Sequence, residues 1–205
     1  MIGAGAIVPE VAREEEGGSV RACPPLCLGH WGEMAYTVRE FRCEDLFRFN
    51  LINLDEMTET YDTRFYMQYL STWPDFCEAV EHPDGTLMAY MLGKVEGEGD
   101  EWHGHVTAVT VAPEFRRLGL AAKLMRNLEA RTDEVGGFFV DLFVRCSNKP
   151  AIAMYETLGY SVYRRVVGYY GGGEDAFDMR KAMKADVHKK SIVPLGRDVQ
   201  AWEVY

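Results

Sequence analysis

The sequence predicts an α/β fold with one mixed sheet and helices on both of its faces. Stretches typical of strands and of helices alternate from Thr37 onward, which is the pattern of an α/β domain. Hydrophobic residues make up 47% of the 205 residues and charged residues 26%, a composition that predicts a packed core. At this length we expect one domain, over residues 34–183, with a disordered extension at 1–33 and a tail at 184–205.

In the first half of the domain, a strand is predicted at Thr37–Phe41. The helix expected next, at Glu44–Ile52, would make its apolar contacts through Leu46, Phe47 and Phe49. A second helix is predicted at Arg64–Ser71, after a polar loop. The Asp-Gly pair at 84–85 favours a tight hairpin between two strands. Residues 93–101 are expected to form a flexible acidic connection.

In the second half, Leu120, Leu124 and Leu128 recur at helical spacing. A further short helix is expected from near Pro150 to Leu158, since proline favours the first turn of a helix and Gly159 favours its end. The strands predicted here cover residues 103–111, 137–144, 162–170 and 176–183. Asp141 is the only residue that breaks the apolar run at 137–144.

The charge balance argues against nucleic acid as a partner. The chain has 22 basic and 32 acidic residues, a net charge of −10, whereas binding to phosphate backbones rewards a basic face. No apolar run approaches the ~18 residues that span a membrane, and residues 1–12 do not resemble a secretory signal. The five cysteines are scattered and odd in number, so we expect reduced thiols in the cytoplasm or nucleus. Cys23, Cys27 and His30 lack a fourth ligand at zinc-like spacing, and no metal is expected.

The most informative run is Val109–Ala121, in which a strand leads through a turn into a helix. The free N–H groups and positive dipole end of such a helix favour anions. Gly119 and Ala121 would let a pyrophosphate approach the backbone, and Arg116 and Arg117 add positive charge. The alternative is an ordinary turn with two solvated arginines, because short glycine motifs are weak signals.

The run Arg116–Ala121 resembles the Arg/Gln-x-x-Gly-x-Gly/Ala motif of the GNAT acetyltransferases. Longer runs, in the same order along the chain, resemble the family of catalytic subunits of N-terminal acetyltransferase B (NatB). These runs are residues 45–50, 54–61, 102–107 and 136–145. The resemblance extends over about residues 34–195 and implies the GNAT fold, whose mixed sheet is mostly antiparallel.

The resemblance implies transfer of an acetyl group from acetyl-CoA to the α-amine of proteins that begin Met-Asp, Met-Glu, Met-Asn or Met-Gln. It also implies a large helical-repeat auxiliary subunit that anchors the enzyme at the ribosome, close to nascent chains. Two alternatives are a GNAT enzyme acting on lysine or small amines, and a non-catalytic acyl-CoA-binding subunit.

Cofactor and acid roles follow from the same resemblance. The backbone beside Val109 and Val111 would pair with the pantetheine arm and polarise the thioester carbonyl. The pyrophosphate would lie at Arg116, Arg117, Gly119, Leu120 and Ala121. Tyr155 would act as the general acid for the thiolate, the alternative being aromatic packing in the core. Asn148 would contact the cofactor or cap the helix that follows it.

Peptide recognition is assigned to the acidic loop 54–62 and to tyrosines opposite it. Glu59 and its acidic neighbours would attract a cationic amine, unless the loop is simply solvated. By resemblance, Tyr61 would hold the peptide backbone together with Tyr169 and Tyr170, the alternative being aromatic packing across strands.

His105 and Thr107 lie two residues apart on a predicted strand and therefore share a face. They are expected to hydrogen-bond the second residue of the peptide. A second interpretation makes His105 the catalytic base, and Glu59 is another candidate for that role.

Overall fold

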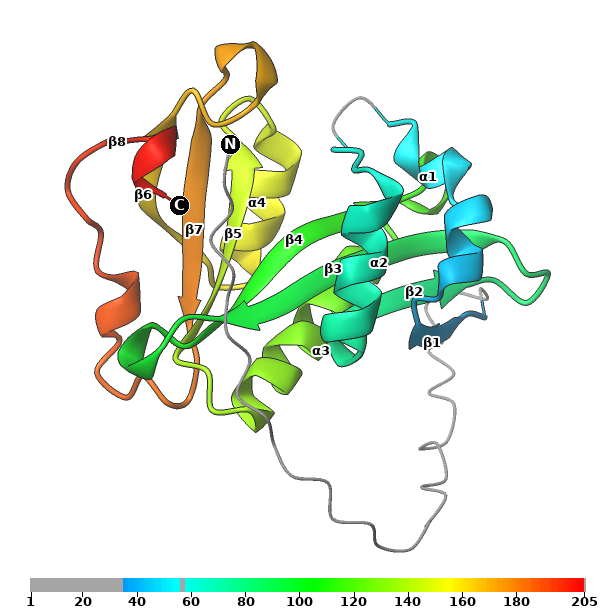
Figure 1. Cartoon of the computed structure of the whole chain (residues 1–205), viewed down its shortest axis with the longest axis horizontal. Coiled ribbons are helices and arrows are strands. Elements are labelled where there is room, and N and C mark those ends of the chain that lie inside the picture. Colours follow the sequence, from blue (N-terminus) through cyan, green and yellow to red (C-terminus); the bar gives the residue numbers. More distant parts are fainter. Residues whose placement is uncertain (1–34, 56–57, 205) are drawn as a thin grey trace, which may run out of the picture.

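The computed structural model describes residues 35–55 and 58–204, so the prediction for residues 1–33 lies outside the described part of the chain. An eight-stranded sheet runs through the protein in the order β1-β2-β3-β4-β5-β7-β6-β8. Two neighbouring pairs, β4 with β5 and β6 with β8, are parallel. The other neighbours pair antiparallel. The expected mixed, mostly antiparallel α/β sheet is therefore confirmed (Figure 1).

The structure contains every predicted strand, close to its range where one was given, and one more near the C-terminal end of the described residues. They are β1 (Thr37–Glu40), β2 (Cys77–Glu81), β3 (Leu87–Glu96), β4 (His103–Val111), β5 (Phe139–Arg145), β6 (Ser161–Val167), β7 (Ala176–Ala182) and β8 (Val199–Gln200). The expectation of a flexible connection from residue 93 is wrong for residues 93–96, because β3 continues there paired with β4, after a register shift between Leu92 and Gly93. Lys94 supports this extension through an ion pair with Glu96 at 2.6 Å.

Helices cover both faces of the sheet, as predicted (Figure 1). Helices α1 (Asn50–Asn53) and α2 (Thr63–Thr72) pack on one face, where Phe49, Ile52, Tyr66 and Tyr69 form a cluster with Tyr90 of β3. Helices α3 (Leu120–Glu134) and α4 (Lys149–Thr157) cover the other face. Their residues Leu124, Leu128 and Ile152 belong to the larger core cluster. No helix among the described residues is long and apolar enough to cross a bilayer.

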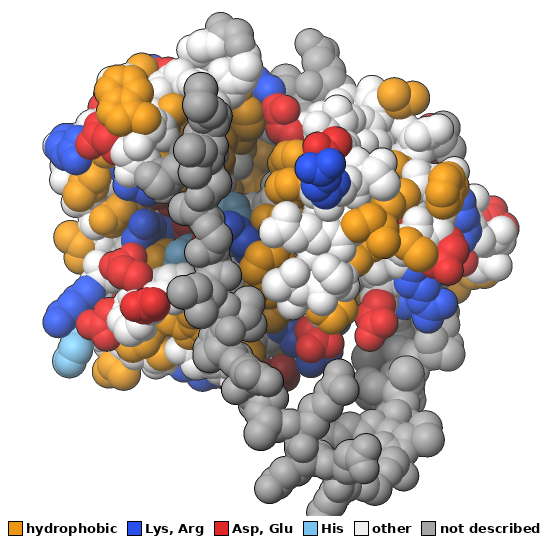
Figure 2. Space-filling model, in the orientation of Figure 1, with side chains coloured by type: hydrophobic (Ala, Val, Ile, Leu, Met, Phe, Trp, Pro, Cys, Tyr) orange, Lys and Arg blue, Asp and Glu red, His pale blue; other side chains and the backbone are white. Residues whose placement is uncertain are grey.

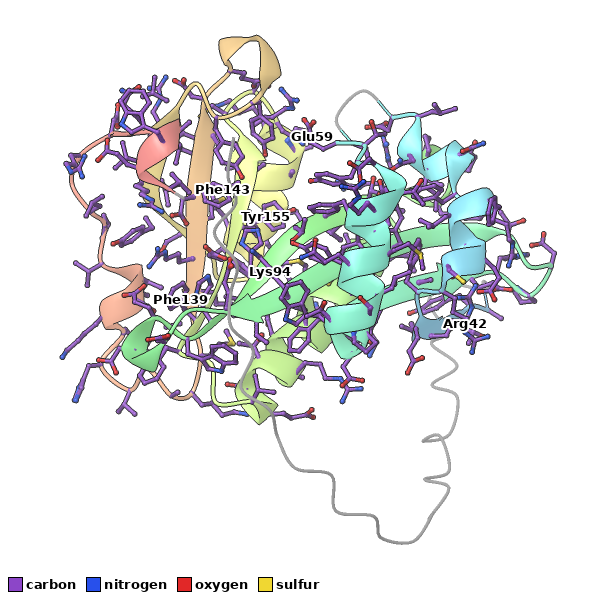
Figure 3. The ribbon with its side chains drawn as sticks, viewed as in Figure 1. Arg42, Glu59, Lys94, Phe139, Phe143 and Tyr155 are labelled. Atoms are coloured by element: carbon purple, nitrogen blue, oxygen red, sulfur yellow. The ribbon has the colours of Figure 1, made fainter. Side chains whose placement is uncertain are left out.

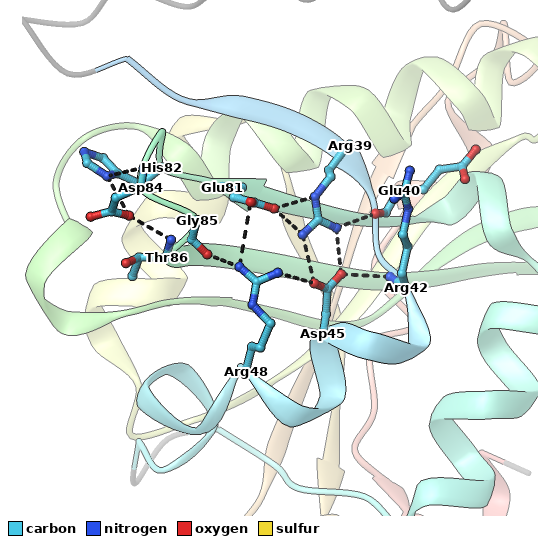
Figure 4. Close-up of polar contacts among 10 residues, drawn as sticks. All are labelled: Arg39, Glu40, Arg42, Asp45, Arg48, Glu81, His82, Asp84, Gly85 and Thr86. Atoms are coloured by element: carbon cyan, nitrogen blue, oxygen red, sulfur yellow. Dashed lines mark hydrogen bonds and ion pairs between the residues drawn. The ribbon is translucent and has the colours of Figure 1, made fainter.

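The single helix predicted at Glu44–Ile52 is wrong: the structure has a 3-10 helix, η1 (Cys43–Phe47), followed by the short α1. The break follows from Asp45, whose buried carboxylate accepts from Arg42 N at 2.9 Å and from Arg39 Nη1 at 2.7 Å. These bonds fix η1 against β1 (Figure 4). Phe47 therefore points outward, 87% exposed, and not into the core as expected.

An ion network extends this contact across the sheet edge. Arg39 also bonds Glu81 of β2, and Arg48 bonds Gly85 O in the turn between β2 and β3 (Figure 4). Charged groups held by several partners restrict each other more than isolated surface pairs do. The network therefore fixes the start of the segment that carries α1 and the loop after it.

Helix α3 lies unusually close to β4 at one point. A Cβ placed on Gly104 would lie 2.1 Å from Thr132 Oγ1, far inside van der Waals contact. Only glycine at this position lets the C-terminal part of α3 rest on the strand. The Thr132 hydroxyl donates a hydrogen bond to Leu128 O at 2.9 Å, within its own helix, so it needs no hydrogen-bond partner in the sheet.

Residues 184–204 fold onto the far edge of the sheet. Asp186 accepts from Ser191 N at 2.8 Å and from Lys190 N at 3.0 Å, which shapes the turn before the 3-10 helix η6 (Lys190–Ile192). β8 then pairs with β6, and Val199 is buried against Val166. The tail thus extends the sheet beyond the strands that were predicted.

Candidate active site

A groove opens where β4 and β5 separate. The two strands pair from His103–Val106 with Phe139–Leu142 and then diverge, while β4 stays paired with β3 as far as Val111 (Figure 1). The divergence opens a cavity of about 660 Å³. The inner edges of the diverging parts have no strand partner among the described residues, so this is where an extended ligand could pair with the backbone. Side chains bond some of the carbonyl groups here, among them those of Thr107 and Phe143.

Most of the predicted site residues line this cavity. They are Glu59, Tyr61, Thr107, Val109, Val111, Arg116, Arg117, Gly119, Leu120, Ala121, Asn148, Tyr155 and Tyr170. His105 and Tyr169 do not line the cavity. Both lie beside Phe143, which does line it. The Phe143 ring stacks on Tyr169 with centroids 4.6 Å apart and lies 5.8 Å from the His105 ring.

The start of α3 forms one wall of the groove. Gly119 precedes the helix with φ of 78°, in the left-handed region that glycine adopts most easily. No side chain caps the helix, and the first intrahelical bond runs from Lys123 N to Gly119 O. The N–H groups of Leu120, Ala121 and Ala122 therefore lack intrahelical acceptors and suit a phosphate. An added Cβ at Gly119 would meet nothing within 4 Å, so the turn, more than crowding, requires this glycine.

Arginines pair with two acids of the loop at residues 54–62. Arg116 Nη2 lies 2.5 Å from Asp55 Oδ2, Arg145 bonds Glu59, and Asp62 caps α2 by accepting from Phe65 N at 2.8 Å. Basic residues distant in sequence thus pair with Asp55 and Glu59, so the alternative of a simply solvated loop does not hold for these two carboxylates. Arg116 thus holds the loop in addition to lining the cavity.

Tyr155 projects from α4 into the cavity wall and is 7% exposed. Burial raises the pKa of its phenol well above the ordinary value, so the group keeps its proton at neutral pH. A protonated phenol beside the groove is suited to donate a proton. Asn148 caps the same helix by accepting from Ala151 N at 3.2 Å, and it also lines the cavity. The capping alternative is therefore confirmed.

Side chains from separate segments close the other side of the groove. Tyr61 OH lies 3.5 Å from Thr107 O, and Tyr69 OH lies 2.8 Å from Thr107 Oγ1. Tyr170 donates to Phe143 O at 3.1 Å, and the Arg145 guanidinium lies 4.2 Å above its ring. Figure 3 shows Glu59 at the mouth of the groove and Tyr155 deeper, between the diverging strands.

Comparisons with known proteins agree with this geometry. Residues 40–160 match the family model described as Acetyltransferase (GNAT) family. The chain is 57% identical to the N-terminal acetyltransferase B complex catalytic subunit NAA20 of Arabidopsis thaliana, over 80% of this chain and 94% of that protein. It is 61% identical to the N-alpha-acetyltransferase 20 of Dictyostelium discoideum, over 80% and 95%. This chain is a GNAT acetyltransferase of the NatB catalytic-subunit family.

A solved structure of the same family supports this assignment. The crystal structure of Chaetomium thermophilum Naa20 in complex with a bisubstrate analogue superposes with a TM-score of 0.79 at 44% identity. The match covers 82% of this chain and 99% of that one. The predicted GNAT fold and NatB resemblance are both confirmed.

Two residues of this GNAT acetyltransferase escaped the sequence analysis. Arg145 bonds Glu59 and Glu174 and so joins the loops on either side of the groove. Asp141 lies 2.7 Å from His105 Nδ1. The signal for Asp141 was present, because it is the one charge in an apolar strand. Its partner could not be identified without the register that sets β5 against β4.

The same face holds a group with metal-ligand chemistry. Glu96, His103 and His105 each offer a ligand atom, and these atoms lie within 4.8 Å of one another. Lys94 already pairs with Glu96, and Asp141 with His105, so the group forms part of a hydrogen-bonded network. That the enzyme works without a metal stays a prediction.

Proposed function

We propose that this enzyme transfers the acetyl group of acetyl-CoA to the α-amine of proteins that begin Met-Asp, Met-Glu, Met-Asn or Met-Gln. The observation that carries the proposal is the identity of 57–61% to NatB-type catalytic subunits over 80% of the chain. The open groove between β4 and β5 supports it, since the groove has room for two substrates that meet end to end.

Acetyl-CoA fits the α3 side of the groove. The free N–H groups at residues 120–122 and the turn at Gly119 suit its pyrophosphate, and the inner edge of β4 beside Val109 and Val111 suits its extended arm. The thioester supplies an activated acetyl group. A β4 backbone N–H would polarise its carbonyl, and Tyr155 would donate a proton to the departing thiolate.

The amine needs little help to become nucleophilic. A free α-amine has a reference pKa of about 7.7–8.0, so a useful fraction is already neutral near pH 7. Glu59 and His105 are the candidate bases. The Glu59 carboxylate is held by Arg145 and His105 by Asp141, so either would act while bonded to a partner.

The peptide enters between the two loops at the mouth of the groove. Tyr61 and Tyr170 line its walls and would hold the first residues of the peptide. His105 and Thr107 lie on the same face of β4 and would hydrogen-bond the side chain of the second residue. Tyr169 supports this region from behind, through its stacking on Phe143.

A large auxiliary subunit with helical repeats completes the proposed enzyme and places it at the ribosome, near nascent chains in the cytoplasm, with a nuclear pool as a further expectation. Phe47 and Leu54, which flank α1, are 87% and 83% exposed and favour a protein partner at this end of the molecule. The described cysteines, Cys43, Cys77 and Cys146, are free, as suits a reducing compartment.

The test is a mass-spectrometric assay of the enzyme co-purified with its auxiliary subunit. The substrates are peptides that differ only at position two, Met-Asp, Met-Glu, Met-Asn, Met-Gln and Met-Leu, plus an N-blocked lysine peptide. Acetylation of the first four supports the proposal. Acetylation of the lysine peptide alone points to a lysine enzyme, and acetyl-CoA binding without any product points to a non-catalytic subunit.

A further inference from the structure

Asp141 is a buried carboxylate that faces two histidines. It lies on β5, is 5% exposed, and approaches His105 Nδ1 at 2.7 Å and His103 Nε2 at 3.6 Å. Burial alone raises the pKa of Asp141, but the charge and hydrogen bond of His105, with His103 and Arg180, hold it below the ordinary value. Asp141 is therefore ionised at neutral pH and can only accept hydrogen bonds.

The strand register places Asp141 in a row of ionisable side chains. Lys94 of β3 pairs with His105 of β4, His105 with Asp141 of β5, and Asp141 with Arg180 of β7. In-register partners on neighbouring strands point to the same face of a sheet. Figure 2 shows histidine and basic side chains together on this face, and Figure 3 places Lys94 and Phe143 where the groove begins.

Other ionisable groups surround the row. They are Glu96 on β3, His103 on β4, Glu101 on the 3-10 helix η3 (Gly99–Glu101), and Tyr69 on α2, which bonds Thr107. Lys94 already pairs with Glu96 at 2.6 Å. Arg180 lies over the Phe139 ring at 4.4 Å. Asp141 is thus the acid in direct hydrogen-bond contact with His105.

This contact fixes which nitrogen of His105 is available to a peptide. An ionised Asp141 requires a proton on Nδ1, so Nε2 is left for other partners. When the ring is neutral, Nε2 accepts a hydrogen bond and matches the amide N–H of Asn. When the ring is protonated, Nε2 donates and matches the carboxylate of Asp, with a favourable charge. The imidazole of His105 can thus hydrogen-bond either Asp or Asn at the second position of the peptide.

We propose that Asp141 is a positioning residue that acts through His105 and sets how strongly the enzyme prefers Met-Asp over Met-Asn termini. The inference rests on the proposed role of His105 in reading the second residue. Removing the Asp141 charge destabilises the imidazolium and shifts the preference toward Met-Asn.

The experiment measures kcat/KM at one fixed pH for two peptides that differ only as Asp or Asn at position two, with the enzyme–auxiliary subunit complex. Titration of the α-amine affects both peptides equally and cancels in the ratio of the two values. The Asp/Asn ratio of each variant, compared with that of the unchanged enzyme, is therefore the readout.

The Asp141→Asn variant is expected to have a ratio about fivefold lower than the unchanged enzyme, the difference between a charged and a neutral hydrogen bond. Asp141→Glu should restore part of the ratio. The matched control is Asp186→Asn, which removes another buried carboxylate, bonded to Ser191 N at 2.8 Å, and should leave the ratio unchanged.

The outcomes separate this inference from the proposed function. An equal loss for both peptides in Asp141→Asn, with an unchanged Asp/Asn ratio, shows a purely structural role and overturns the inference. Absence of acetylation of either peptide by the unchanged complex overturns the proposed function itself. Circular dichroism melts of each variant identify those that fail to fold. If Asp141→Asn fails to fold, Asp141→Glu, whose longer side chain displaces the carboxylate, decides the proposal by whether its Asp/Asn ratio falls.

Discussion

The two sides of the groove are built in different ways. The acetyl-CoA side comprises the end of β4, the turn at 112–119 and the start of α3, one continuous segment whose useful groups are largely backbone N–H groups. The peptide side comprises the loop at 54–62, residues 103–107 of β4 and the loop at 168–175, which meet through side chains such as Arg145 and Tyr61. A backbone site depends on one local conformation, whereas a side-chain site depends on contacts among distant segments.

Tyr155 lies where the two sides meet, so its removal is expected to have the largest effect. Tyr155→Phe deletes the proton donor and keeps the ring, and turnover on a Met-Asp peptide should fall about 10²-fold or more. Acetyl-CoA binding, measured by calorimetry, should change little.

The control for this variant is Tyr160→Phe. Tyr160 is another buried tyrosine, whose ring lies 6.0 Å from that of Tyr155 and whose hydroxyl donates to Glu129 at 3.1 Å. It does not line the cavity, and near-normal turnover is expected. Comparable turnover in the two variants would refute the acid role of Tyr155.

Replacing Asp45 tests whether the peptide side of the groove depends on the ion network of Arg39, Asp45 and Glu81 at the far edge of the sheet. Burial alone raises the pKa of Asp45, but the Arg39 and Arg42 bonds hold it below the ordinary value. The carboxylate therefore stabilises the fold above its unfolded pKa of about 3.9, and this stability is lost as the pH falls through the lower folded pKa. Asp45→Asn should reduce the free energy of unfolding by about 2 kcal/mol at pH 7.

Urea denaturation at several pH values checks this expectation. The difference between Asp45→Asn and the unchanged protein should shrink as the pH falls below about 4. Asp75→Asn, at an exposed position, is the control and should have little effect. If the peptide KM rises while the acetyl-CoA KM stays constant, the comparison between the two sides is sharpened; equal rises would contradict it.

Gly119 and Gly136 form a matched pair for the acetyl-CoA side. Both have positive φ, 78° and 73°, and an added Cβ at either meets nothing within 4 Å. Alanine at each position should cost about 1–2 kcal/mol of stability. Only Gly119→Ala should raise the acetyl-CoA KM, about tenfold, equivalent to about 1.4 kcal/mol. A similar rise in Gly136→Ala would show that lost stability, not the turn, causes the effect.

Arg145 is expected to give the smallest effect, because partly exposed ion pairs contribute about 1 kcal/mol or less. Arg145→Ala frees Glu59 and Glu174, and the peptide KM should rise about threefold while the acetyl-CoA KM stays constant. The difference should decrease at high salt, which screens such pairs. Arg165→Ala, which breaks a pair with Asp175 in the neighbouring hairpin, should leave both KM values unchanged.

The same contrast explains what could be predicted from the sequence. The strand, turn and helix of the acetyl-CoA side could be predicted because they follow one another along the chain. The peptide side was found only in part, through the resemblance of residues 54–61 and 102–107. The partners of its acids, Arg116 and Arg145, lie many residues away, and a sequence pattern carries no information about such contacts.

The fold shows a similar division. The β4 range matches the prediction because apolar and polar residues alternate over most of its length. The prediction of one helix at Glu44–Ile52 is wrong because the Asp45 carboxylate accepts hydrogen bonds from Arg39 and from the backbone N–H of Arg42. These bonds hold the segment in a 3-10 helix and not in a continuous α-helix. The β8 pairing was not expected because a two-residue strand leaves no periodic signal.

The contact between Gly104 and Thr132 has a consequence at a distance. Thr132 lies twelve residues after Leu120, and a helix rises about 1.5 Å per residue, so the contact lies about 18 Å from the end of α3 that faces the groove. A helix is stiff over this length. Any side chain larger than hydrogen at position 104 would tilt α3 as a whole, and its first N–H groups would turn away from the pyrophosphate. Residue 104 thus controls the orientation of the N–H groups at the start of α3, with which it has no direct contact.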